Sequence, residues 1–118
     1  DGMLYVCDVG MKRVAAFTPQ GRFVRQLSLL GWKAASDAAV SWIEPYVAVD
    51  AKGFVYVSDS TTNTIHRFEP GGRAVAQAGG EGNAPGQLRG PKGIAVDSQG
   101  NLYIADSYNH RVVKARFP

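Results

Sequence analysis

The chain has 118 residues, 45% of them apolar and 19% charged, and its net charge is +3. This is the length and composition of one ordinary globular domain. No apolar run approaches the roughly 18 residues of a transmembrane helix, and the Lys and Arg residues are scattered, so charge alone does not indicate nucleic-acid binding. The single cysteine, Cys7, excludes an internal disulfide and leaves the compartment open.

The same sequence pattern occurs three times along the chain. Aligning the copies on Asp8, Asp59 and Asp106 gives offsets of 51 and 47 residues. Self-similarity at this period predicts a stacked or radial repeat fold. The copies are GMLYVCDVGMKRVAA (2–16), GFVYVSDSTTNTIHR (53–67) and GNLYIADSYNHRVVK (100–114).

Each unit predicts short antiparallel strands, because its apolar runs are short, rich in aromatic and β-branched residues, and bounded by turn residues. The chain then holds strands two to four of a first unit, all four strands of a second and the first three of a third. The opening segment supplies one of these ten strands. The others are expected at Val14–Phe17, Arg22–Leu27, Tyr46–Val49, Phe54–Ser58, Ile65–Phe68, Arg73–Ala78, Gly93–Val96, Asn101–Ala105 and Val112–Ala115.

Two of the turns between strands have a clear signature, Asp50–Gly53 and Asp97–Gly100. An Asp at the start of such a turn accepts hydrogen bonds from the backbone two residues on, and Gly accepts positive φ. Both turns therefore predict hairpins, with Gly53 and Gly100 as structural residues. Four antiparallel strands per period of just under fifty residues predict one propeller blade.

The run GEGNAPGQLRGPKGIAVDSQGNLYIADSYNHRVVKARF (80–117) resembles an NHL repeat, including Asn109-His110-Arg111 in its loop. Residues 53–80 resemble it moderately and residues 2–30 weakly. The resemblance implies an all-β fold of four-stranded β-propeller blades, usually six to a ring. About two and a half blades would be present: a partial blade at 2–30, a full blade at 45–80 and a partial blade at 91–118.

A closed ring needs every blade to pack on two neighbours. At about 47 residues per blade, six blades need a much longer chain than this one. Either the sequence is an excerpt of a longer protein, or several copies associate to close a ring. Ten strands do not divide into whole blades, which favours the excerpt.

Several repeated polar residues are expected to be structural. Asp8, Asp59 and Asp106 end a strand, where a carboxylate accepts bonds from the following loop. The alternative, three carboxylates ringing an axis around a metal, is less favoured because the Asp recurs in every unit. Arg111 is expected to reach a neighbouring carboxylate or carbonyl. His66 and His110 stand at different repeat positions, so no metal or other cofactor is expected, and no catalytic residue is assigned.

Binding residues are sought where loops vary on a constant scaffold. The loops between the second and third strands are polar and differ between repeats. The segment 31–44 departs most from the repeat; its two Trp residues predict either an aromatic binding surface or a plug between blades. The candidate partner-binding residues are Lys12, Trp32, Trp42, Thr61, Asn63, Tyr108, Asn109 and His110.

The function favoured by the sequence is a non-catalytic propeller module that presents one loop face to a protein, peptide or glycan, because no nucleophile, base and metal set can be assembled. The first alternative is an excerpt of a lyase- or lactonase-like propeller enzyme whose metal site lies partly in absent blades. The second is single-stranded RNA binding, which needs a basic face with exposed aromatic residues.

Overall fold

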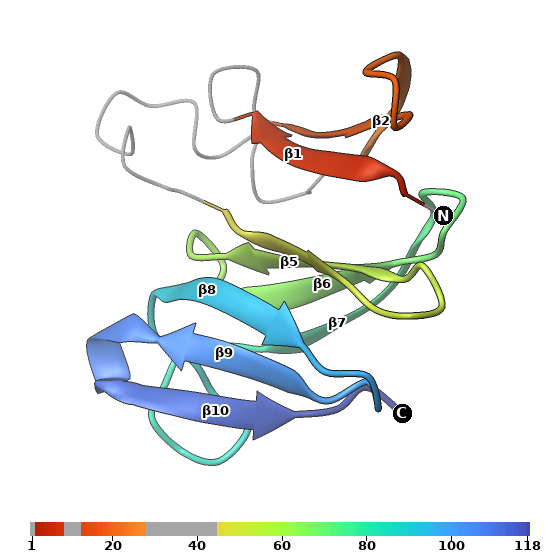
Figure 1. Cartoon of the computed structure of the whole chain (residues 1–118). Helices are drawn as coiled ribbons and strands as arrows, with labels where there is room; N and C mark the ends of the chain where they lie inside the picture. The colour runs from red at the N-terminus through yellow and green to blue at the C-terminus, as the bar shows by residue number, and fades with distance from the viewer. Residues whose placement is uncertain (1, 9–12, 28–44) are drawn as a thin grey trace, which may run out of the picture.

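The computed structural model describes residues 2–8, 13–27 and 45–118 and shows three antiparallel sheets stacked on one another (Figure 1). Blade 1 has the strand order β1-β2-β3, blade 2 the order β4-β5-β6-β7 and blade 3 the order β8-β9-β10. The prediction of an all-β fold built from propeller blades is confirmed. The strands are β1 (Leu4–Asp8), β2 (Arg13–Phe17), β3 (Phe23–Leu27), β4 (Val47–Val49), β5 (Val55–Asp59), β6 (Thr64–Phe68), β7 (Ala74–Gly79), β8 (Pro91–Val96), β9 (Leu102–Asp106) and β10 (Arg111–Ala115).

The β4–β5 and β8–β9 hairpins close with the same turn geometry. Asp50 Oδ1 accepts hydrogen bonds from the Lys52 and Phe54 amides at 2.9 and 3.0 Å, and Asp97 makes the equivalent two bonds at 2.9 Å each. Gly53 and Gly100 have φ of 88° and 84°, a conformation that glycine adopts without steric cost. Local sequence is therefore sufficient to specify both turns.

Alternate side chains of β5 point into two different cores. Val55 and Val57 pack toward blade 1, whereas Tyr56 packs toward blade 3. All five residues of β5 are buried. A strand with this pattern has no solvent face, so blade 2 is held between its two neighbours.

The two interfaces differ at their outer rim. Leu27 and Phe68 fill this position between blades 1 and 2, and each is only 1% exposed. The corresponding residues between blades 2 and 3 are Ala78, which pairs with Ile65 as Leu27 pairs with Val14, and Ala115. Two large apolar side chains are thus replaced by methyl groups.

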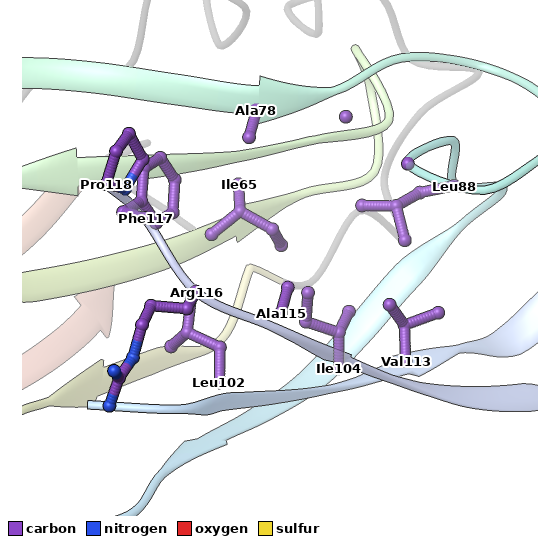
Figure 2. A pocket seen from close by; sticks show the side chains of 12 residues that line it. Ile65, Ala78, Leu88, Leu102, Ile104, Val113, Ala115, Arg116, Phe117 and Pro118 are labelled. Atoms are coloured by element: carbon purple, nitrogen blue, oxygen red, sulfur yellow. The ribbon is translucent and has the colours of Figure 1, made fainter. Parts of the chain in front are cut away.

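These replacements leave an apolar cavity of about 130 Å³ between blades 2 and 3. Figure 2 shows Ile65 and Ala78 on one side and Leu102 and Ile104 on the other. The cavity is closed in part by Leu88 from the loop before β8 and by the chain after β10. Its other lining residues are Gly79, Gly86, Val113, Ala115, Arg116, Phe117 and Pro118.

The outward faces of blades 1 and 3 carry exposed apolar side chains. Leu4 and Val6 are 50% and 48% exposed on blade 1, and Val112 is 70% exposed on blade 3. No helix within the described ranges is long and apolar enough to cross a membrane.

Filling the cavity should stabilise the fold. We expect Ala78→Leu to raise the free energy of unfolding by about 1 kcal/mol, because the new isobutyl group occupies the rim position that Leu27 fills in the other interface. Urea denaturation measures the change. Val75→Leu, on the same strand but outside the cavity lining, is the matched control and should change stability by less than about 0.5 kcal/mol. A destabilised Ala78→Leu would mean that the cavity cannot accept the side chain.

Candidate functional site

One edge of the blade stack is formed by the loops 60–63, 80–90 and 107–110, which we call the loop face. The middle loop is clamped on its first side by Asn63, whose carbonyl accepts from the Gly80 amide and whose Oδ1 accepts from the Gly90 amide, both at 2.8 Å. On its second side, Asn109 Nδ2 donates to the Gly82 carbonyl at 2.8 Å. The loop face is therefore a cross-linked surface rather than three independent turns.

Asp106 is the centre of this cross-linking. Its carboxylate is completely buried and accepts bonds from the Arg89 amide at 2.7 Å, Asn109 Nδ2 at 2.8 Å and Arg111 Nε at 2.8 Å. Burial alone would raise the pKa of Asp106, but these three donors outweigh it and hold the pKa below its usual range. Contrary to the sequence-based expectation, one of its donors is the amide before β8, not only the loop that follows Asp106.

Arg111 extends the same network to the middle loop. Its terminal nitrogens donate to the carbonyls of Asn83 and Gln87 at 3.0 and 2.8 Å. The guanidinium thus bridges a buried carboxylate and two backbone carbonyls, which uses the fork of donors that arginine offers. Blade 1 keeps the ion pair in a looser form, with Arg13 Nε 3.2 Å from Asp8 Oδ2.

Blade 2 replaces the arginine partner by a histidine. Thr64 stands at the position of Arg13 and Arg111, and Asp59 instead contacts His66 Nε2 at 3.0 Å. His66 is only 8% exposed. The Asp59 carboxylate also accepts from the Thr61 and Thr62 amides of the following loop. Burial would raise the pKa of Asp59, but His66 and these loop donors lower it overall.

The candidate partner-binding residues fall into three groups. The side chains of Asn63 and Asn109 form the hydrogen bonds between loops described above. Thr61 is half-buried, whereas Tyr108 and His110 are exposed. Lys12, Trp32 and Trp42 lie outside the described residues.

Tyr108 is an exposed large apolar side chain on the loop face, with 66% of its surface accessible. It belongs to a short 3₁₀ turn, Ser107–Asn109, that ends at His110 in the left-handed region with φ of 52°. Its ring stands directly on Gly90, since a Cβ atom at Gly90 would lie 2.2 Å from Tyr108 Cδ2. Sequence reasoning missed Gly90, although the glycine-rich stretch before it marks the loop that carries it. The aromatic ring is thereby held in place while most of its surface faces solvent.

Neither a metal cluster nor an activated thiol stands out in the described part of the chain. No three His, Cys, Asp or Glu side chains there lie close enough together to hold a metal. Burial raises the pKa of the Cys7 thiol to about 11, so this thiol is protonated at neutral pH and is a poor nucleophile.

Comparisons with known proteins agree with this architecture. The NHL repeat family matches residues 88–115, and no curated protein matches the sequence. In fold, the chain is similar to virginiamycin B lyase from Staphylococcus aureus, with a TM-score of 0.60 and 14% identity over 98% of this chain and 38% of that chain. A streptogramin B lyase gives a TM-score of 0.64 and 13% identity over 99% and 38%. Kuenenia stuttgartiensis hydrazine synthase gives 0.60 and 11% over 96% and 32%. The chain thus spans less than two fifths of the length of each of these proteins.

The division of the loop face into a buried network and an exposed ring can be tested by two substitutions. Asp106→Ala should lower the free energy of unfolding by about 1–3 kcal/mol, because it leaves the Arg89 amide and Arg111 Nε without an acceptor. Tyr108→Ala should change it by less than about 0.5 kcal/mol. Urea denaturation of both variants measures this; equal losses would contradict the division.

Stability should fall in acid. The folded-state pKa of Asp97 is lowered to about 2, chiefly by hydrogen bonds from the Asn101 side chain and backbone, and Asp59 and Asp106 shift in the same direction. Their contribution is therefore complete above the unfolded pKa of about 4 and is lost as the pH falls toward 2. Urea midpoints measured from pH 6 to pH 2 should show the decline. Asp97→Asn should show a shallower decline over the same range, and an unchanged slope would refute the assignment for Asp97.

Proposed function

We propose that the chain, whose residues 88–115 match the NHL repeat family, is a non-catalytic propeller module whose loop face binds a protein, peptide or glycan. The observation that carries this proposal is the Tyr108 ring, 66% exposed on a loop face whose backbone is cross-linked. Aromatic side chains are the commonest anchors of binding interfaces. An anchor already held in position loses little entropy when it binds.

The surroundings of Tyr108 suit a polar partner. Arg89 and His110 are both exposed. His110 follows Tyr108 by two residues, and the Arg89 carbonyl accepts a hydrogen bond from the Tyr108 amide at 3.0 Å. These groups place hydrogen-bond donors beside an apolar ring face. Peptides and glycans both combine polar groups with surfaces that stack on such a ring.

We also propose that blades 1 and 3 pack on further blades, from a longer chain or from other copies. Leu4 and Val6 on one outer face and Val112 on the other are apolar and exposed. Leu4 and Val6 alternate along β1 with Tyr5 and Cys7, which face blade 2. A propeller blade packs on a neighbour at each face, so these surfaces are the places where the ring would continue.

A second candidate function is that of an enzyme excerpt. Its support is the fold similarity to virginiamycin B lyase and streptogramin B lyase. In that case the groups that carry out the reaction would come in part from other blades, and the loop face would contribute substrate contacts.

Arrays of peptides, glycans and single-stranded RNA test the binding proposal. We expect the chain to bind probes of the peptide or glycan class and Tyr108→Ala to weaken that binding at least about tenfold. Val75→Ala, on β7, is the control and should bind as the unsubstituted chain does.

Three results would oppose this function. Binding that survives Tyr108→Ala would place the site elsewhere. Binding of RNA alone, with a steep salt dependence, would favour the RNA alternative. Cleavage of a bound probe would favour the enzyme.

A further inference from the structure

A second recess lies at the opposite edge of the stack, where the hairpin turns Asp50–Gly53 and Asp97–Gly100 of blades 2 and 3 face each other. It is a cleft of about 360 Å³. Tyr56 and Arg67 from blade 2 form one wall, and Ser98, Gln99 and the chain after β10 form the other. The loop face does not contribute to it.

Arg67 is held in this cleft by aromatic rings. Its guanidinium carbon lies 4.0 Å from the centroid of the Phe54 ring, 5.8 Å from that of Tyr56 and 5.9 Å from that of Phe117. Such stacking fixes the plane of the guanidinium while leaving its N–H groups at the edge.

The guanidinium of Arg67 keeps one donor without a partner within the described part of the chain. Its Nε atom is buried without a hydrogen-bond partner, and no described carboxylate forms an ion pair with it. A buried donor without an acceptor is costly. The terminal nitrogens of the same guanidinium have no described carboxylate as an ion-pair partner, so they can donate to an anion supplied from outside the chain.

The side chains that line the cleft carry more positive than negative charge. Lys52, Arg67 and Arg116 line it, against one acidic side chain, that of Asp50. Asp50 already accepts from the amides of its own turn and from the Tyr56 hydroxyl at 3.0 Å. The cleft therefore presents excess positive charge beside the faces of Tyr56 and Phe117.

Blade 3 has an equivalent set of three side chains, an aspartate, a tyrosine and a cation, but no cleft around it. Tyr103 donates to Asp97 Oδ2 at 3.2 Å, and Lys114, in the position of Arg67, lies 6.0 Å from the Tyr103 ring. This trio is on the outward face of blade 3, where no described residue forms an opposite wall. The repeat thus provides a matched cation with no pocket around it.

We propose that the cleft between the two hairpin turns binds a small organic anion that carries a carboxylate or a phosphate group. The charged oxygens accept hydrogen bonds from Arg67 and Lys52, and the apolar body of the anion lies against Tyr56 and Phe117. This site is separate from the loop face and does not depend on the function proposed for it.

The experiment follows the ¹H–¹⁵N signal of the Arg67 Nε–H group while phenyl phosphate or benzoate is added to the 118-residue chain. We expect a saturable shift of this signal with at least one of the two anions, with a dissociation constant of about 1 mM or tighter. The anion with the lower dissociation constant identifies the preferred group, phosphate or carboxylate.

Three variants separate binding from packing. Calorimetry should show binding weakened at least about tenfold by Arg67→Met and unchanged by Lys114→Met. Lys52→Ser, at the exposed rim, should weaken it about threefold without disturbing the aromatic stack, and so decides the question if Arg67→Met does not fold. The proposal is overturned if neither anion shifts the Arg67 signal, if Lys52→Ser binds as the unsubstituted chain does, or if Lys114→Met loses as much affinity as Arg67→Met.

Discussion

The fold depends on the burial of β5 on both faces. Val55 and Val57 enter one core and Tyr56 the other, so blade 2 cannot lose either neighbour without exposing apolar surface. Hydrophobic burial is therefore distributed between blades rather than within them, as in other repeat architectures. The loop before β8 also contributes to the second core, through the buried side chain of Leu88.

Variation within the repeat is compensated locally. Where blade 3 pairs Asp106 with Arg111, blade 2 pairs Asp59 with His66 from two residues further along the next strand. The buried carboxylate keeps a partner in both cases, as the cost of an unpaired buried charge requires. The rim of the interface between blades 2 and 3 is not compensated in this way. Ala78 and Ala115 are both smaller than Leu27 and Phe68 of the other interface, and a cavity remains.

The two edges of the stack differ in the hydrogen-bond partners of their polar side chains. On the loop face, Asn63, Asn109 and Arg111 satisfy backbone groups of the neighbouring loop, which fixes the surface around Tyr108. At the turn edge, Asp50 accepts hydrogen bonds from its own turn, while Arg67 has aromatic neighbours and an Nε donor without a partner. The loop face thus uses these three side chains within the fold and exposes the Tyr108 ring, whereas the turn edge keeps the unpartnered Nε of Arg67.

The sequence by itself determined the strands and the hairpin turns, because both arise from patterns within a few residues: alternating β-formers, and Asp followed three positions later by Gly. It also drew attention to Asp59 and Asp106, which the structure shows buried, since an aspartate recurs at this repeat position. Only the tertiary structure decided that Asn63 and Asn109 are cross-links rather than exposed binding groups, that His66 is buried, and that Arg67 lies in a cleft. These properties depend on contacts across two blades, such as Asn63 with Gly90 and Arg67 with Phe117. A repeat aligned with itself shows which residues are equivalent, but not which residue of the next blade each one meets.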